Sequence, residues 1–186
     1  QASYSKTQVK MIRIFLIGFM GAGKTTLGRY LASELGVSFC DLDIFIEQRF
    51  RKSVSDIFAQ HGEVGFREIE RNMLHEVGEF EDVVIACGGS TPLFFDNMDY
   101  MLKQGSTIYL RATNETLIRR LKEARSKRPL VARKNDEELA VFVENEIKRR
   151  EPGYLRSEYI CEADYLESIE QIADAVKEVK RVLKIE

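Results

Sequence analysis

The most specific chemical pattern in the chain is a glycine-rich run that ends in a lysine and two threonines. Residues 18–25 read GFMGAGKT and fit the pattern GxxxxGK[ST] at every defined position, and a second threonine follows. Glycines let backbone N–H groups turn inward around phosphate oxygens, where a Cβ would intrude. The lysine supplies charge to the β- and γ-phosphates, and the next hydroxyl can bind Mg²⁺. The residues expected to bind nucleoside triphosphate are Gly21, Ala22, Gly23, Lys24, Thr25 and Thr26.

Two carboxylates, Asp41 and Asp43, follow a short apolar stretch and are separated by one residue. Residues i and i+2 on an extended chain project to the same side, so both could face one cleft. One could hold Mg²⁺ through water while the other orients or deprotonates an acceptor hydroxyl. Aspartate also caps helices, and the spacing alone does not decide between a cap and a functional role for Asp43.

Two arginines are candidates for holding an anionic substrate. Arg67 and Glu70 are three residues apart in a predicted helix, so Glu70 could fix the guanidinium for a two-point grip on a carboxylate. A surface ion pair has the same spacing. Arg150 precedes Pro152 at the predicted end of another helix, where a cation could reach a ligand or simply complement the helix C-terminus.

Residues 119–134 hold eight basic side chains against a single acid, Glu123. Such a run is usually a solvated face or a nucleic-acid patch. A basic lid that closes over triphosphate and excludes water explains it equally well. The whole chain has 28 Lys and Arg against 30 Asp and Glu, a net charge of −2, which argues against a broad nucleic-acid footprint.

The composition is that of one ordinary globular domain. Of 186 residues, 44% are hydrophobic and 31% are charged, which excludes collagen-like, disordered and disulfide-scaffold classes. No apolar run reaches the roughly 18 residues that span a bilayer. Three widely spaced cysteines and two histidines make a zinc site hard to assemble and favour a reducing compartment. We therefore expect a cytoplasmic, monomeric protein with no nucleic-acid or membrane partner. We expect a single domain over residues 11–186, and residues 1–10 to be an added or disordered extension.

Short apolar runs alternate with stretches of helical periodicity. The expected strands are residues 12–17, 38–42, 83–87, 107–110 and 163–166. The expected helices begin near Lys24, near Asn114, at an Asp136 cap and near Ile169, and a further helix contains residues 66–70. Gly88 and Gly89 end the third strand. They form either a plain turn or a place where a ligand approaches the backbone closely. This alternation predicts βαβ units, a parallel sheet and helices on both of its faces.

Taken in order, these motifs resemble the shikimate kinase family, in the nucleoside-monophosphate-kinase-like group of P-loop proteins. The resemblance runs from Ile12 to about Tyr154 and comprises GFMGAGKTT, DLD, FRxxE, CGG, RPL and RxPxY. It implies a five-stranded parallel sheet in a three-layer α/β/α sandwich of P-loop NTPase type, with a small mobile lid at about residues 120–135. It also implies ATP-dependent phosphorylation of the shikimate 3-hydroxyl to shikimate 3-phosphate and ADP, a step toward aromatic amino acids.

The resemblance further implies a role for each residue that matches a motif. Asp43 would hold the acceptor hydroxyl as the candidate base, and Thr25 and Asp41 would serve Mg²⁺. The catalytic candidates are Lys24, Asp43 and Arg128. Arg128 would span the ATP phosphates and Arg125 would stack on adenine. The remaining shikimate-binding candidates are Arg67 and Arg150 for the carboxylate, Gly88 and Gly89 for the ring hydroxyls, and Phe58 and Phe66 for the ring walls. The chain has Ser90 where the family usually has a third glycine.

Two rival functions are set against this hypothesis. Another small-molecule P-loop kinase, such as a gluconate-type enzyme, would share the phosphate loop but would not need Arg67 and Arg150 as a carboxylate clamp. A P-loop switch or nucleic-acid-binding ATPase would use the basic stretch as its interface. No NKxD guanine-reading motif is present.

Overall fold

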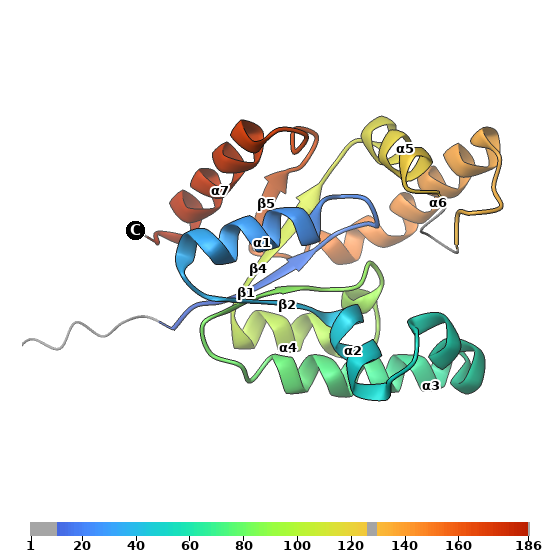
Figure 1. The fold of residues 1–186 in the computed structure, drawn as a ribbon, viewed down its shortest axis with the longest axis horizontal. Helices are drawn as coiled ribbons and strands as arrows, with labels where there is room; N and C mark the ends of the chain where they lie inside the picture. Colours follow the sequence, from blue (N-terminus) through green and yellow to red (C-terminus); the bar gives the residue numbers. More distant parts are fainter. Residues whose placement is uncertain (1–10, 126–129, 186) are drawn as a thin grey trace, which may run out of the picture.

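The computed structural model describes residues 11–125 and 130–185, so the expectations for residues 1–10 and for Arg128 lie outside the described residues. The described chain contains a five-stranded sheet in the order β2-β3-β1-β4-β5, and every neighbouring pair is parallel (Figure 1). The strands are β1 Arg13–Ile17, β2 Ser38–Asp41, β3 Val83–Ala86, β4 Ser106–Arg111 and β5 Tyr159–Glu162. The predicted α/β class with a five-stranded parallel sheet is confirmed.

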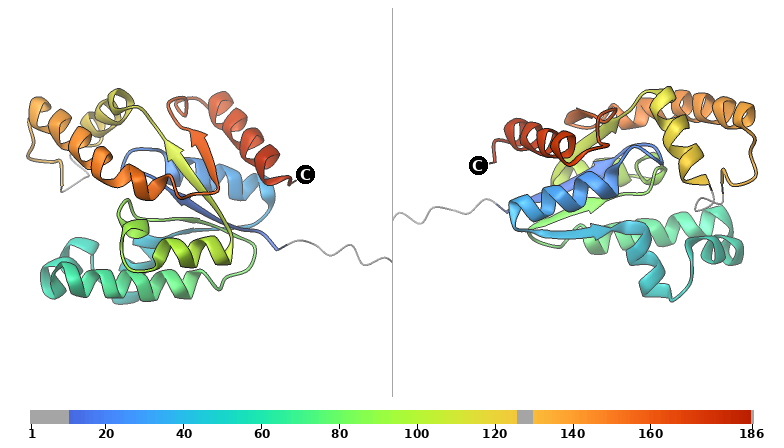
Figure 2. Two further views of the ribbon diagram at one scale, coloured as in Figure 1. Left: turned by 180° about the vertical axis from the view of Figure 1, so that it is seen from behind. Right: turned by 45° about the horizontal axis from the view of Figure 1, so that its top comes forward.

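Helices cover both faces of the sheet. They are α1 Lys24–Leu35, α2 Leu42–Phe50, α3 Val54–Val77, α4 Asn97–Gln104, α5 Asn114–Glu123, α6 Asp136–Tyr154 and α7 Ile169–Leu183, with a short 3-10 helix, η1, at Thr91–Leu93. Helices α1 and α7 contact each other on one face, and α3, α4 and α6 lie on the other (Figure 2). None of the helices in the described ranges is long and apolar enough to cross a membrane.

The central strand explains where the glycine-rich loop sits. Strand β1 pairs with β3 on one side and β4 on the other and is buried along its whole length. Burial on both faces requires the continuous apolar run that predicted it. The chain leaves the carboxyl end of β1 directly into the loop and then into α1. The loop therefore lies at the edge of the sheet where ligands bind in open α/β folds.

The last strand was predicted in the wrong place. It is β5, Tyr159–Glu162, whereas residues 163–166 form the loop after it. Among the described residues, β5 is an edge strand paired with β4 alone, and it is largely exposed, so it carries no continuous apolar run. The apolar character of Ala163 and Leu166 reflects burial of the loop, since both are 7% exposed or less.

Helix α6 differs from its prediction at both ends. Its cap is Asn135, not Asp136, and Asn135 forms a reciprocal capping box with Glu138. At the other end the helix continues through Pro152 to Tyr154. Proline has no N–H to donate to the carbonyl four residues earlier, so the last turn of α6 lacks that hydrogen bond although the helix continues.

Candidate active site

The loop of residues 18–25 has the backbone that its glycines predict. Gly21 and Gly23 have φ values of 81° and 101°, in the left-handed region that favours glycine. A Cβ on Gly23 would also lie 2.8 Å from Leu166 Cδ1. Gly23 caps α1 without a side-chain hydrogen bond, so the N–H groups of the first turn are presented to a ligand.

Lys24 lies across the mouth of this loop. Its Nζ donates to the carbonyls of Gly18 and Phe19 at 2.8 and 2.9 Å. These bonds hold the ammonium group beside the loop backbone, where phosphate oxygens would meet it.

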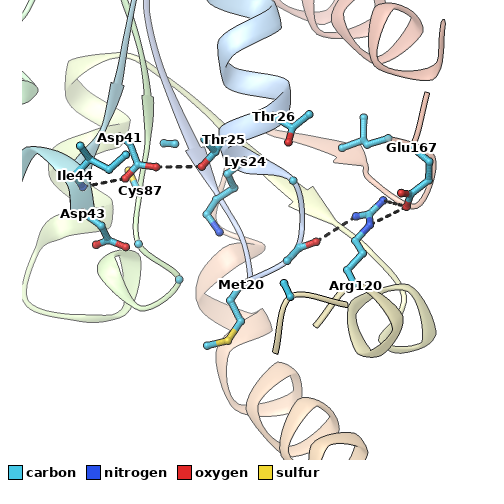
Figure 3. Close-up of a pocket in the computed structure, with 17 residues that line it drawn as sticks. Met20, Lys24, Thr25, Thr26, Asp41, Asp43, Ile44, Cys87, Arg120 and Glu167 are labelled. Carbon is cyan, nitrogen blue, oxygen red and sulfur yellow. Dashed lines mark hydrogen bonds and ion pairs between the residues drawn. The ribbon is translucent and has the colours of Figure 1, made fainter. Parts of the chain in front are cut away.

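A cleft of about 490 Å³ opens over the loop (Figure 3). The predicted site residues that line it are Gly21, Gly23, Lys24, Thr25, Thr26, Asp41, Asp43, Gly88 and Gly89. They come from the ends of β1, β2 and β3 and from the starts of α1 and α2. Ala22 is buried in the loop behind the cleft. The parallel sheet thus brings together motifs that are far apart in the sequence.

Asp41 joins the P-loop helix to the end of β2. Its Oδ2 accepts from the Thr25 hydroxyl at 3.0 Å, and its Oδ1 accepts from the Ile44 N–H at 3.2 Å. The second bond makes Asp41 the cap of α2, so the cap interpretation considered for Asp43 belongs to Asp41 instead. Thr25 and Asp41 together offer two oxygen ligands of the kind that Mg²⁺ prefers.

Asp43 faces the cleft from the first turn of α2 (Figure 3). Burial raises the pKa of this carboxyl from 3.8 to about 6, with further increases from the charges of Asp41 and Glu70 and an opposing decrease from Lys24. The carboxyl is thus poised to gain or lose a proton near neutral pH, as a general base requires.

The Gly88–Gly89 turn is where several functional side chains meet. A Cβ on Gly88 would lie 3.2 Å from both Asp43 Oδ1 and Glu70 Oε1, and a Cβ on Gly89 would lie 3.4 Å from Arg150 Nη1. The two glycines therefore keep side-chain atoms out of a narrow space between carboxylates and an arginine. Ser90 has φ −106° and ψ −7°, an ordinary conformation for any residue, so the turn does not need a third glycine.

Arg67 is held in a buried network rather than a surface ion pair. Its Nη1 donates to Glu70 Oε2 at 2.9 Å, and its guanidinium lies 4.2 Å from the centroid of the Phe94 ring. Only 12% of the Arg67 side chain and 2% of the Glu70 side chain is exposed. A buried pair of this kind fixes the direction of the guanidinium.

Arg150 is also buried, on the other side of the glycine turn. Its Nε and Nη2 donate to Glu146 Oε2 at 2.8 and 2.5 Å, and its guanidinium lies 5.1 Å from the centroid of the Phe19 ring. The guanidiniums of Arg149 and Arg150 hold the pKa of Glu146 below its ordinary value. The Tyr154 hydroxyl donates to the Gly89 carbonyl, which ties the end of α6 to the turn.

Four predicted substrate-binding residues lie beside the cleft rather than on its lining. Arg150 lies beside Gly89, and Arg67 is connected to the turn through Glu70, which lies beside Gly88. Phe58 and Phe66 are in contact with each other, with ring centroids 5.5 Å apart, and Phe66 also contacts the Arg67 guanidinium.

Arg125 does not line the cleft, but Arg120 does. Arg125 follows the end of α5, and its Nη2 donates to Asp136 at the start of α6 at 2.6 Å. Arg120 instead donates to the carbonyls of Gly21 and Ala22, each at 3.3 Å, and to Glu167 at 3.0 Å. Sequence reasoning missed Arg120 because it is one of eight similar cations, and only its position on α5 sets it apart.

These features define a P-loop kinase: a lysine-bearing phosphate loop at the end of the central strand, a hydroxyl and carboxylate suited to Mg²⁺, and two buried arginines beside the cleft. A family model described as shikimate kinase matches residues 20–181. The chain is 50% identical over 175 residues to a shikimate kinase of Bacteroides fragilis, covering 94% of this chain and 98% of the relative. It is 51% identical over 173 residues to a shikimate kinase of Phocaeicola vulgatus, covering 93% and 99%.

Solved structures agree with this assignment. A crystal structure of shikimate kinase from Bacteroides thetaiotaomicron matches with a TM-score of 0.92 and 48% identity, over 94% of this chain and 99% of the other. The Acinetobacter baumannii shikimate kinase, solved in complex with shikimate, matches with a TM-score of 0.81 and 32% identity, over 94% of each chain. The chain belongs to the shikimate kinase family, as its motifs predicted.

Proposed function

We propose that the cleft transfers the γ-phosphoryl group of ATP to the 3-hydroxyl of shikimate, giving shikimate 3-phosphate and ADP. The observation that carries this proposal is the Gly88–Gly89 turn. The Asp43 carboxylate and the buried cation Arg150 lie beside it, and Glu70, also beside it, holds the second buried cation, Arg67. A substrate with a carboxylate and a reactive hydroxyl matches this arrangement of charge.

The polyphosphate would bind at the glycine loop. Backbone N–H groups at the start of α1 and the Lys24 ammonium would surround the β- and γ-phosphates, and Thr26 would add a hydrogen bond. Arg120, held over the loop by carbonyls, would contact the nucleotide from α5 in place of Arg125. We retain Arg128 as the lid residue that spans the phosphates, on the family resemblance alone.

Mg²⁺ fits the pair Thr25 and Asp41. The described residues contain no group of three or more His, Cys, Asp or Glu side chains that could bind a metal. Mg²⁺ in phosphoryl-transfer sites is typically held by one or two protein oxygens together with phosphate and water oxygens, which suits this sparse set. When bound there, Mg²⁺ would neutralise charge on the transferring phosphoryl group.

At the acceptor end, Asp43 would accept a hydrogen bond from the shikimate 3-hydroxyl. As the new O–P bond forms and the bond from the γ-phosphorus to the leaving ADP oxygen breaks, Asp43 would take the hydroxyl proton. Arg67 and Arg150 would hold the carboxylate, and Phe58 and Phe66 would pack near the ring. Because the transition state is largely dissociative, alignment and charge neutralisation contribute most of the catalysis.

We also propose that residues 11–186 act as one monomeric domain in the cytoplasm, without nucleic-acid partners. The cations of the basic stretch support the last point, because Arg119 pairs with Glu167, and Lys122 and Arg125 both pair with Asp136. All three cysteines are unpaired thiols, as a reducing compartment allows. Sedimentation at assay concentrations tests the oligomeric state.

A coupled ADP-release assay tests the proposed reaction. ATP and Mg²⁺ are offered with shikimate, with gluconate, with nucleoside monophosphates, and with no acceptor in the presence or absence of a polynucleotide. We expect strong turnover with shikimate alone. Turnover with gluconate instead would assign the chain to another class of small-molecule kinase, and acceptor-independent turnover stimulated by polynucleotide would assign it to the ATPases.

A further inference from the structure

Thr91 is a fully buried residue two positions after the Gly88–Gly89 turn. Its hydroxyl donates a hydrogen bond of 2.7 Å to Glu70 Oε1, while Glu70 Oε2 accepts from Arg67 Nη1 at 2.9 Å. Thr91 is 0% exposed and Glu70 is 1% exposed. The three side chains therefore form one continuous chain of hydrogen bonds from the core to Arg67.

The bond to Glu70 decides which edge of Arg67 remains available. With Nη1 bonded to Glu70, the edge formed by Nε and Nη2 is the one whose donors make no hydrogen bond among the described residues, and it suits a two-point contact to a carboxylate. Arg67 Nε is buried and has no hydrogen-bond partner among the described residues. Nη2 lies 3.9 Å from Glu63, which is beyond hydrogen-bond length. An incoming carboxylate would satisfy a donor that is otherwise buried without a partner.

Thr91 is well placed to orient Glu70. The terminal torsion of a glutamate is broad, so a carboxylate held at one oxygen can still turn. The Thr91 bond fixes the second oxygen. The backbone of Thr91 is itself fixed, since its N–H donates to the Gly88 carbonyl at 3.1 Å and its carbonyl accepts from Asn97 Nδ2 at 2.9 Å.

Building on the proposed role of Arg67, we propose that Thr91 is a positioning residue for the shikimate carboxylate. Its hydroxyl orients Glu70, and Glu70 presents the Nε–Nη2 edge of Arg67 to the substrate. Thr91 touches neither substrate nor phosphate in this arrangement. Its contribution therefore falls on shikimate affinity rather than on the chemical step.

The test compares Thr91→Val, which removes the hydroxyl but keeps the shape, with Thr91→Ser, which keeps the hydroxyl. We expect Thr91→Val to raise the KM for shikimate about tenfold, the scale of one lost hydrogen bond to a charged group. We expect kcat and the KM for ATP to stay within about twofold, and Thr91→Ser to restore the wild-type KM for shikimate. Thr107→Val is the matched control. Thr107 is also 0% exposed, and its hydroxyl accepts from the Glu158 N–H near the amino end of β4, away from the cleft.

A valine at position 91 could disturb the packing, so a second variant and a double-mutant measurement test the same role. The Thr91 hydroxyl lies 2.9 Å from the position of a Cβ on Gly88, so the site is tight, and Thr91→Ala carries the same prediction without added bulk. In a Glu70→Ala background, loss of the Thr91 hydroxyl should not change the KM for shikimate further, because its target is gone.

An unchanged KM for shikimate in a folded Thr91→Val or Thr91→Ala enzyme, or equal effects on the two substrates, would overturn the positioning role. So would a full additional loss in the Glu70→Ala background. A wild-type enzyme that releases no ADP in response to shikimate would instead overturn the proposed function, and this inference with it.

Discussion

The Thr25 hydroxyl and the Asp41 carboxylate are joined by a hydrogen bond of 3.0 Å that connects the P-loop helix to the end of β2. The same carboxylate caps α2, and Asp43 lies in the first turn of that helix. This contact thus sets the position of the proposed metal site. It also sets the position of the proposed base, which lies two residues after Asp41. This contact links the helix that follows β1 to the end of β2, two strands that are separated in the sheet by β3.

Replacing Asp43 with asparagine should lower kcat by about 10²-fold or more, because the amide cannot accept the hydroxyl proton. The measurement is shikimate-dependent ADP release at saturating substrates. Asp99→Asn is the control, since Asp99 is an aspartate on α4 that pairs with Arg156 at the surface. A kcat close to wild type for Asp43→Asn would remove Asp43 from the chemical step.

The same substitution should stabilise the fold at neutral pH in the absence of Mg²⁺ and nucleotide. The pKa of Asp43 is raised to about 6 from 3.8, so the folded state binds this proton more tightly than the unfolded state, and ionisation costs stability as pH rises through that window. A shift of this size corresponds to about 2–3 kcal/mol at pH 7.

Denaturant unfolding of wild type and Asp43→Asn at several pH values measures this difference. We expect the variant to be more stable at pH 7 and the gap to close toward pH 4, where the wild-type carboxyl is protonated in the folded state. A stability difference that does not depend on pH would show that the surroundings of Asp43 do not disfavour its ionised form.

Arg67→Ala should raise the KM for shikimate by at least about 30-fold and leave the KM for ATP nearly unchanged, because the lost cation faces only the acceptor. Arg71→Ala is the matched control. Arg71 lies one turn further along α3 and pairs with Asp96 at the surface. A large rise in the KM for ATP upon Arg67→Ala would place that residue at the nucleotide instead.

Arg120→Ala should weaken ATP binding about tenfold, since Arg120 lines the cleft and bonds to the carbonyls of the P-loop. Arg125→Ala should have little effect on ATP, because its guanidinium bonds to Asp136 away from the cleft. Equilibrium binding of a non-hydrolysable ATP analogue to both variants checks that Arg120→Ala loses more affinity than Arg125→Ala. The reverse order would restore Arg125 as the nucleotide contact.

Features that depend on residues adjacent in the sequence were predictable from the sequence. The P-loop requires contiguous residue types, so GFMGAGKTT identifies it without any knowledge of the rest of the chain. Strand β1 was predictable because a strand buried on both faces must be apolar throughout. Edge strand β5 lacks that constraint, since one side and much of its surface face solvent, and it was therefore misplaced.

Features that depend on which helix face meets which partner were not predictable. Asp41 and Asp43 both had the residue type of a cap, and only the hydrogen bond to Ile44 assigns the cap to Asp41. Asn135 and Asp136 presented the same ambiguity at the start of α6. Arg120 on α5 and Arg125 just after that helix are equally charged, but they bond to different partners.

The amino-acid sequence alone determined the phosphate loop, the parallel α/β class and the kinase family, because each of these is written in contiguous motifs and in their order. Only the tertiary structure decided that the Gly88–Gly89 turn lies between Asp43, Glu70 and Arg150, and that Thr91 reaches Arg67 through Glu70. The physical reason is that a parallel sheet brings distant strand ends to one edge. Contacts across that edge depend on strand order and helix packing, which local residue patterns do not encode.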